Sequence, residues 1–314
     1  MGINVLSLCD GISGGQQSLK VANVKVNNYF ASEINDESIK VTMENFPHTV
    51  QLGDMEDLLR FDDNGKIIIG EKLKNLPKID LLIGGTPCQG LSSANPNREN
   101  LKDIRSKLFY NYVAIRNWLI ENNNNELKFF LENVRPDKKT LPLMNEAIGT
   151  EPIAINSELV SAQRRLRYYW TNINDGTILQ PEPRNIKIKD VIYDNNYKQF
   201  KDDRIERTKR KTKNYFQYDL SGKGYKSQAD RAYYLDGTFP TLCKAQPSNK
   251  ANIWLGGDLY RRIHPIEGER AQGLPDNYTS IIKSDSKRLG LVGDGWNIPT
   301  IVHIFNYLPD EWFY

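Results

Sequence analysis

The feature that most constrains the fold is an alternation over the first 135 residues, in which short apolar runs are separated by stretches of helical character. The apolar runs, each typical of a strand, span 4–10, 28–34, 48–54, 79–85 and 127–133. Helices are predicted at 13–22 and 106–121. Strands without a polar face are typical of a parallel sheet that helices cover on both sides. We therefore expect an α/β fold.

Polar residues end these runs, where the carboxyl ends of parallel strands form a ligand crevice. They are Asp10, Glu33, Asp54, Cys88 and Glu132. After the first run, a glycine turn lets a ligand approach the N–H groups at a helix start. Its G-x-x-G-G spacing differs from the G-x-G-x-x-G of dinucleotide folds, which argues against NAD. Because Glu33 suits a ribose and Asp54 an adenine amine, an adenosine-containing ligand is favoured.

Composition argues against several other classes of protein. Three cysteines form no Cys-x-x-Cys pair and three histidines lie far apart, so we expect neither a disulfide framework nor a metal site. No run approaches the roughly 18 apolar residues of a membrane span, and no charged leader precedes the first strand. We therefore expect a cytoplasmic protein.

The charge and the pattern both change in the second half of the chain. Between Arg184 and Arg231 there are fourteen Lys and Arg against seven Asp and Glu, with aromatic residues interleaved, although the whole chain carries only +3. Such a stretch is either a solvated face or a phosphate-contacting module. Short segments and Gly/Ser turns from Gly176 onward indicate a smaller domain over 176–284. Residues 1–175 and 285–314 are then the larger domain, with a final helix whose first turn holds Pro299.

Cys88 follows a strand end and a glycine-shaped loop, so it is either a nucleophile or a small buried residue. Glu132 ends the next strand and should face the same crevice. In an extended segment Arg165 and Arg167 share one face, while Arg164 points away. A thiol, a carboxyl group and two guanidinium groups suit the addition of sulfur to an electron-poor ring.

The residues of these motifs and their order along the chain resemble those of the cytosine-C5 DNA methyltransferases. SLCDGISGG is similar to their first cofactor motif, GGTPCQGLS to their catalytic Pro-Cys loop, LENV to their Glu-Asn-Val, and QRRLR to their Gln-x-Arg-x-Arg. RRIHPIEGERAQGLPDNYT resembles the penultimate motif. LVGDGWNIPTIVHIF resembles the last one, in the Trp-containing form of eukaryotic de novo enzymes and some phage relatives. Only the basic middle region lies outside the resemblance.

The resemblance implies a Rossmann-like S-adenosylmethionine-dependent methyltransferase domain with a mostly parallel sheet, and a smaller DNA target recognition domain. It implies methyl transfer to C5 of a flipped-out cytosine in duplex DNA, with S-adenosylhomocysteine as product. Cys88 would add to C6 of the base. Glu132 would interact with N3 and Arg167 with O2, while Arg165 would support Glu132.

The same resemblance assigns further residues to ligands. Those expected at S-adenosylmethionine are Asp10, Gly11, Ile12, Gly14, Glu33, Ile34, Asp54, Met55, Pro87, Trp296 and Asn297. Those expected at DNA are Gln89, Ser92, Arg98, Arg105, Gln163, Thr241 and Leu242. The segment 89–109 would be a lid that closes over DNA. One departure is Cys9, which stands where the family usually has Phe.

Two alternatives remain open beside a DNA (cytosine-5-)-methyltransferase from a prokaryote or a phage-infected cell. One is the transfer-RNA branch of the same superfamily, which the absence of a Cys-Phe-Thr signature disfavours. The other is an inactive homologue that only binds DNA, which the joint presence of Cys88, Glu132, Arg165 and Arg167 disfavours. A cognate restriction endonuclease is a candidate partner.

Overall fold

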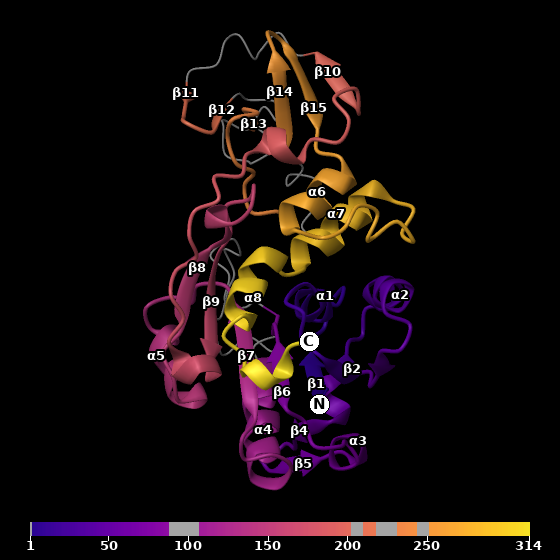
Figure 1. Cartoon of the computed structure of the whole chain (residues 1–314), viewed down its shortest axis with the longest axis vertical. Coiled ribbons are helices and arrows are strands. Elements are labelled where there is room, and N and C mark those ends of the chain that lie inside the picture. The colour runs from indigo at the N-terminus through magenta and orange to yellow at the C-terminus, as the bar shows by residue number, and fades with distance from the viewer. Residues whose placement is uncertain (1, 88–106, 202–209, 218–230, 244–250) are drawn as a thin grey trace. The chain divides into compact units, whose positions relative to one another are not determined.

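The computed structural model describes residues 2–87, 107–201, 210–217, 231–243 and 251–314 (Figure 1). Two compact units divide the chain: unit 1 is Met1–Ile155, Leu166–Gln180 and Ile301–Tyr314, and unit 2 is Asn156–Arg165 and Pro181–Thr300. Unit 2 thus takes in two segments, 156–165 and 285–300, that the sequence had suggested for the larger domain. Segment 156–165 belongs to unit 2 because its backbone is hydrogen-bonded there: Phe239 N donates to Ala162 O, and Arg164 N donates to Phe239 O.

Unit 1 holds the predicted α/β layers. Its strands are β1 (Ile3–Leu8), β2 (Val26–Ser32), β3 (Val50–Gln51), β4 (Leu59–Phe61), β5 (Ile67–Ile69), β6 (Leu81–Gly84), β7 (Lys128–Asn133), β8 (Ile153–Asn156) and β9 (Leu166–Thr171). Its helices are α1 (Gly14–Val21), α2 (Asp36–Asn45), α3 (Glu71–Lys74), α4 (Lys107–Asn122) and α5 (Thr140–Ile148), and α8 (Ile298–Phe305) ends in it. A 3-10 turn, η1, spans Met55–Asp57.

Seven strands form one sheet in the order β3-β2-β1-β6-β7-β9-β8. The five strands from β3 to β7 pair in parallel, and β9 runs antiparallel to β7. Figure 1 shows β2, β1, β6 and β7 side by side in this order. The mostly parallel sheet predicted from the apolar runs is confirmed, and the fold is Rossmann-like.

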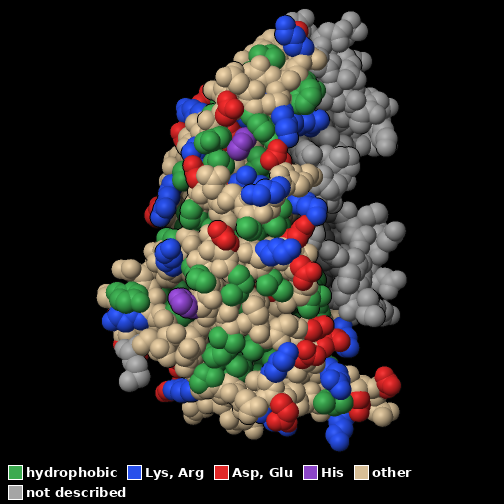
Figure 2. Space-filling model, turned by 90° about the vertical axis from the view of Figure 1, so that its right-hand side faces the viewer, with side chains coloured by type: hydrophobic (Ala, Val, Ile, Leu, Met, Phe, Trp, Pro, Cys, Tyr) green, Lys and Arg blue, Asp and Glu red, His purple; other side chains and the backbone are tan. Residues whose placement is uncertain are grey.

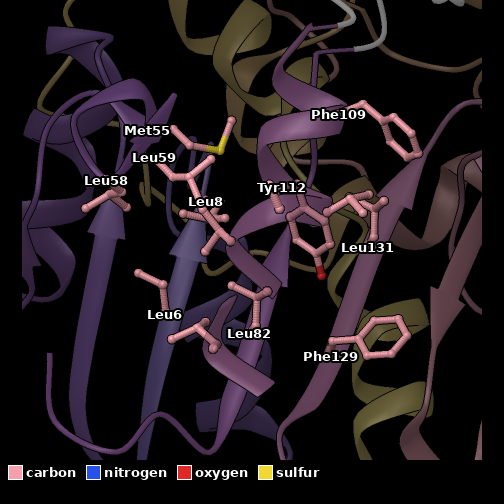
Figure 3. Close-up of a cluster of buried hydrophobic side chains, with 14 of the residues drawn as sticks. Leu6, Leu8, Met55, Leu58, Leu59, Leu82, Phe109, Tyr112, Phe129 and Leu131 are labelled. Carbon is pink, nitrogen blue, oxygen red and sulfur yellow. The ribbon is translucent and has the colours of Figure 1, made fainter. Parts of the chain in front are cut away.

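The central strands of this sheet are buried on both faces. On one face Leu6 and Leu82 pack in a cluster with Tyr112 of α4 (Figure 3). On the other face the ring of Phe130 lies 5.4 Å from that of Phe305 on α8. Because the central strands β1, β6 and β7 are covered on both faces, both of their side-chain sets are largely apolar, which explains the continuous apolar runs in the sequence.

Unit 2 carries a second sheet with the order β10-β15-β14-β13-β12-β11. Its elements are β10 (Gln199–Lys201), β11 (Arg210–Lys211), β12 (Tyr215–Gln217), β13 (Arg231–Tyr233), β14 (Asn252–Gly256), β15 (Leu259–Arg262), α6 (Pro265–Gln272) and α7 (Asp285–Asp294). All strand pairs are antiparallel except β13–β14. The fully buried ion pair between Arg261 of β15 and Glu267 of α6, at 2.7 Å, ties the sheet to the helix.

Surface charge is mixed rather than segregated on the side of the molecule drawn in Figure 2. Among the residues drawn in colour there, Lys and Arg side chains are interspersed with Asp and Glu.

Helix α4 packs closely against Gly84, the last residue of β6, and a substitution of this glycine tests that contact. A Cβ atom there would lie 2.8 Å from Tyr112 Cε2, inside van der Waals contact. Gly84→Ala is therefore expected to lower the free energy of unfolding by about 1–3 kcal/mol, as overpacking of a core does. Urea unfolding measures this change. An unchanged midpoint and slope would contradict the close approach of α4 to β6.

Candidate active site

The parallel sheet brings several predicted residues to one edge. Since β2, β1, β6 and β7 all run in one direction, the segments after their last residues meet at the carboxyl edge of the sheet. Asp10, Glu33 and the Thr86–Pro87 segment follow three of these strands, and Glu132 lies at the end of the fourth. The candidate site of unit 1 is built on this edge.

The glycine loop between β1 and α1 has an unusual backbone. Cys9, Gly11 and Ser13 have φ values of 56°, 59° and 60°, in the left-handed region that L side chains rarely adopt. Open space surrounds the Cα of Gly11 where a Cβ would point, since no heavy atom lies within 4 Å. A backbone that is both strained and accessible is typical of a loop that contacts a ligand.

Glu33 holds this loop against the end of β2. Its Oε2 accepts a hydrogen bond from Gly11 N at 2.7 Å, and its Oε1 accepts from Ile34 N and Asn35 N at 2.8 Å each. Asp10 N also donates to Ser32 O at 3.1 Å. A carboxylate oxygen can accept two hydrogen bonds, so Oε2 keeps acceptor capacity for a ligand hydroxyl.

Asp10 has one satisfied and one unsatisfied oxygen. Tyr29, which is 3% exposed, donates its hydroxyl proton to Asp10 Oδ1 at 2.7 Å. Asp10 Oδ2 is buried and has no hydrogen-bond partner among the described residues. Burial raises the pKa of the Asp10 carboxyl to about 6; the nearby hydroxyls of Ser7, Tyr29 and Ser13 oppose the rise, and the charge of Glu33 adds to it. A ligand with a cationic hydrogen-bond donor would satisfy Oδ2 and so remove the free-energy cost of leaving it buried without a partner.

Cys9 is unsuited to nucleophilic attack. Burial raises the pKa of its thiol to about 12, and the negative charges of Glu33, Asp54 and Asp10 add to the rise. Because the thiolate is the reactive form, Cys9 stays inert near neutral pH.

Four residues predicted at the cofactor, of which Ile34 and Asp54 are those expected at the adenine, differ in exposure. Ile34 is 70% exposed beside Glu33, which leaves an apolar surface free for a ring. Asp54 is exposed, and its Oδ1 accepts from Glu56 N at 2.9 Å as the N-cap of η1. Met55, in contrast, is 3% exposed and lies in the apolar cluster of Figure 3. Ile12 is 2% exposed.

Asn133 ties the ends of β6 and β7 together. Its Nδ2 donates to Thr86 O at 3.3 Å and to Thr86 Oγ1 at 3.1 Å, and both residues are almost fully buried. Thr86 is followed by Pro87, the last residue described before the gap. The segment that leads to Cys88 is thus attached to the strand that carries Glu132.

Glu132 and Arg167 form an ion pair at the same edge. In the antiparallel register of β7 and β9, Glu132 lies opposite Tyr169, and Arg167 is two residues further along the same face. Such diagonal neighbours are within reach of a long side chain. Arg167 Nε lies 2.8 Å from Glu132 Oε1, with the two side chains 13% and 12% exposed. The structure brings these two predicted residues together and largely shields them from water.

Arg165 and Gln163 are bound inside unit 2. The Arg165 guanidinium donates to the carbonyl oxygens of Leu242, Gly293 and Gly295 at 3.0–3.2 Å. Gln163 is fully buried, and its Oε1 accepts from Leu242 N at 2.9 Å. Leu242 is 3% exposed. The DNA contacts predicted for Gln163 and Leu242 stay predictions, and the structure shows a role for both in joining 163–165 to 242.

Three more predicted residues lie in unit 2. Thr241 Oγ1 donates to Arg164 O at 2.8 Å. Asn297 is 2% exposed, and its Nδ2 donates to Ser161 Oγ and Ala271 O at 3.0 and 3.2 Å. Trp296 is half-buried. The side chain of Asn297 is therefore engaged within its own unit.

Five predicted residues lie outside the described part of the chain. They are Cys88, Gln89, Ser92, Arg98 and Arg105. Within the described part, no group of three or more His, Cys, Asp and Glu residues could hold a metal ion. No helix in that part is long and apolar enough to cross a membrane.

Tyr29 and Thr86 were not selected from the sequence, although both position site residues. The signal for Tyr29 was a hydroxyl-bearing ring within a predicted strand, because such a hydroxyl needs a hydrogen-bond partner when it is buried. Thr86 stands directly before Pro87 in the catalytic-loop motif, but its partner Asn133 is far along the chain.

The raised pKa of Asp10 gives a pH-dependent prediction. Between pH 4 and 6 the folded state keeps a proton that the unfolded chain loses, so stability falls as pH rises through this window. Asp10→Asn removes the titration while keeping an acceptor for Tyr29. We expect the variant to gain about 1–3 kcal/mol over the natural chain at pH 7.5 and about a third of that gain at pH 4.5.

Urea unfolding at both pH values measures the difference. Asp54→Asn is the matched control, since it removes a carboxylate from the same edge at an exposed position. An equal effect of Asp10→Asn at the two pH values would contradict the assignment.

Known proteins show similarity over the same regions. Residues 3–140 match the family model described as C-5 cytosine-specific DNA methylase. The chain is 30% identical over 203 residues to the orphan methyltransferase M.SPRI of Bacillus phage SPR. The aligned region covers 60% of this chain and 42% of that protein. This chain is 26% identical over 329 residues to the type II methyltransferase M1.ScrFI of Lactococcus lactis subsp. cremoris, covering 95% and 75% of the two chains.

Solved structures share the fold at lower identity. The Entamoeba histolytica methyltransferase EhMeth has a TM-score of 0.66 at 16% identity, with 99% of each chain covered. The S. pombe Dnmt2 methyltransferase has a TM-score of 0.62 at 14% identity, with 98% of each covered.

The first curated relatives are longer proteins, and the chain spans less than half of their length: 42% of M.SPRI and 18% of DRM1 from Arabidopsis thaliana. The match to the family model covers the glycine loop, the Thr86–Pro87 segment and Glu132. Residues 3–140 of this chain are therefore similar to the C-5 cytosine-specific DNA methylase family.

Proposed function

We propose that this chain is a DNA (cytosine-5-)-methyltransferase, which transfers a methyl group from S-adenosylmethionine to C5 of cytosine in duplex DNA. The observation that carries the proposal is the Glu132–Arg167 pair, shielded from water at the sheet edge. Asn133, next to Glu132, is bonded to the segment that leads to Cys88. The family match supports the class of reaction.

In this reaction Cys88 is the nucleophile. Its thiolate forms a bond to C6 of the ring, while Glu132 supplies a proton to N3 and Arg167 holds O2. The electrons displaced from the C5–C6 double bond make C5 nucleophilic, and C5 takes the methyl group from S-adenosylmethionine, which leaves as S-adenosylhomocysteine. A base then removes the C5 proton, N3 gives its proton back to Glu132, the electron pair returns to the ring, and the C6–S bond breaks to release Cys88.

The target cytosine has to leave the base stack for this chemistry. C5 and C6 must meet two reagents from opposite sides of the ring, and neither side is open within a duplex. Extrusion of the base costs a few kcal/mol of unstacking. The pair of Glu132 and Arg167 then recognises N3 and O2, which lie on the Watson–Crick edge that extrusion exposes.

The carboxyl edge of unit 1 fits S-adenosylmethionine. Glu33 Oε2 suits a ribose hydroxyl, Ile34 an adenine face and Asp54 the adenine amine. The buried, unpartnered Oδ2 of Asp10 suits the ammonium group of the methionine part. The sulfonium of this cofactor supplies an electrophilic methyl group, and the residues at the edge bind and orient it.

Unit 2 is the proposed DNA target recognition domain. The stretch from Arg184 to Arg231, which belongs to this unit, has fourteen Lys and Arg against seven Asp and Glu. Basic side chains that neutralise phosphates release counterions and give affinity for DNA. A cognate restriction endonuclease remains a candidate partner of the proposed enzyme.

Cys88→Ser is expected to abolish methyl transfer, because a serine hydroxyl is too weak a nucleophile to add to C6. Transfer of tritiated methyl groups to plasmid DNA measures the activity. Calorimetry with S-adenosylmethionine should show binding within about twofold of the natural chain. Cys243→Ser is the matched control and should keep its activity. Near-normal transfer by Cys88→Ser would rule out the mechanism.

Duplex DNA with 5-fluorocytosine at the target should trap the protein covalently. Fluorine cannot leave C5 as the proton does, so the C6–S bond persists after methylation. A band resistant to denaturing electrophoresis should form with the natural chain and not with Cys88→Ser. Bisulfite sequencing of plasmid from expressing cells identifies the target for this duplex. Transfer to tRNA but not to DNA would instead support the transfer-RNA alternative.

A further inference from the structure

One face of the sheet in unit 2 carries a ladder of aromatic side chains. Phe200 of β10 pairs with Tyr260 of β15, which in turn pairs with Trp254 of β14. Directly paired residues point to the same side of a sheet, so the three rings share one face. Tyr234, just after β13, continues the row, because its ring lies 5.8 Å from that of Trp254.

The rings are ordered against one another and partly open to solvent. Phe200 and Tyr260 stack with centroids 5.6 Å apart and planes 24° from parallel. Phe200 is 41% exposed, and Trp254 and Tyr234 are half-buried. Tyr260, in the middle of the row, is only 6% exposed. The rings that a ligand can reach are therefore those of Phe200, Trp254 and Tyr234.

Positive charge accompanies the rings. Arg262 lies on the ladder face, two residues from Tyr260, and its guanidinium is 5.5 Å from the Phe200 ring centre. Its Nη1 donates to Asn252 Oδ1 at 2.5 Å, which fixes the side chain over this face. A cation beside stacked rings complements a phosphate linked to a base.

We propose that the ladder face, formed by Phe200, Trp254, Tyr234 and Arg262, binds unpaired bases of single-stranded nucleic acid by stacking. Every base has a π-face, but in a duplex these faces are covered by neighbouring pairs, so partly exposed rings favour unpaired bases. This function goes beyond the proposed methyl transfer, because it requires neither Cys88 nor a methyl donor.

The test is binding of fluorescently labelled single-stranded oligothymidylate of 12 nucleotides, measured by anisotropy without cofactor. The Cys88→Ser chain serves as background, so that failure of the methyltransfer proposal leaves this result interpretable. Phe200→Leu and Trp254→Leu remove a ring and should each weaken binding roughly five- to 100-fold, the range found for loss of one stacking partner. Phe200→Tyr and Trp254→Phe keep a ring and should bind within about threefold.

Tyr193→Leu is the matched control, since Tyr193 is a 51% exposed aromatic residue of unit 2 outside the ladder, and it should not weaken binding. Far-UV circular dichroism and urea unfolding verify the fold of each variant. An abasic strand of the same length and charge should bind at least tenfold more weakly.

Four outcomes would overturn the proposal. The first is that the abasic strand binds as tightly as oligothymidylate, and the second is that the ring-removing variants keep the affinity of the natural chain. The third is that the ring-retaining variants lose as much affinity as the ring-removing ones. The fourth is that the ring-removing variants lose as much affinity for duplex DNA as for the single strand. The last would mean that the face contacts the backbone of duplex DNA instead of unpaired bases.

Discussion

Parallel pairing of β2, β1, β6 and β7 is the constraint on which the candidate site depends. It places the ends of four strands at one edge, so residues distant in the sequence meet there without a long connecting loop. The helices on both faces keep the strands dry and leave only their ends for polar groups. The glycine loop, the Thr86–Pro87 segment and Glu132 all use such ends.

Glu33 and Asp10 fix the geometry of the candidate site at this edge through their hydrogen bonds. Glu33 accepts backbone N–H groups from the glycine loop and from its own strand end, which fixes one against the other. Asp10 is bound on one oxygen by Tyr29 and unsatisfied on the other. An unsatisfied buried oxygen lowers stability, so its presence beside a strained loop is more typical of a ligand site than of a structural one.

Local sequence patterns predicted the larger elements well and the shorter ones poorly. The helix expected at 106–121 is α4 (Lys107–Asn122), and the strand expected at 127–133 begins one residue later, as β7. The strand expected at 48–54, however, is only Val50–Gln51, because Gly53 turns the chain at φ 82° and Asp54 caps η1. The hairpin of β4 and β5 was missed, since its strands have three residues each.

The sequence alone determined the parallel sheet, the residue types at its edge and the family resemblance, because apolar periodicity and short motifs are local. Only the tertiary structure decided which of those residues meet. Arg167 reaches Glu132 through the register of two antiparallel strands, while Arg165, two residues away, bonds carbonyl groups of unit 2. Met55 and Asn297 likewise proved to be buried within their units. Register and burial depend on contacts between segments far apart in the chain, and no local pattern encodes them.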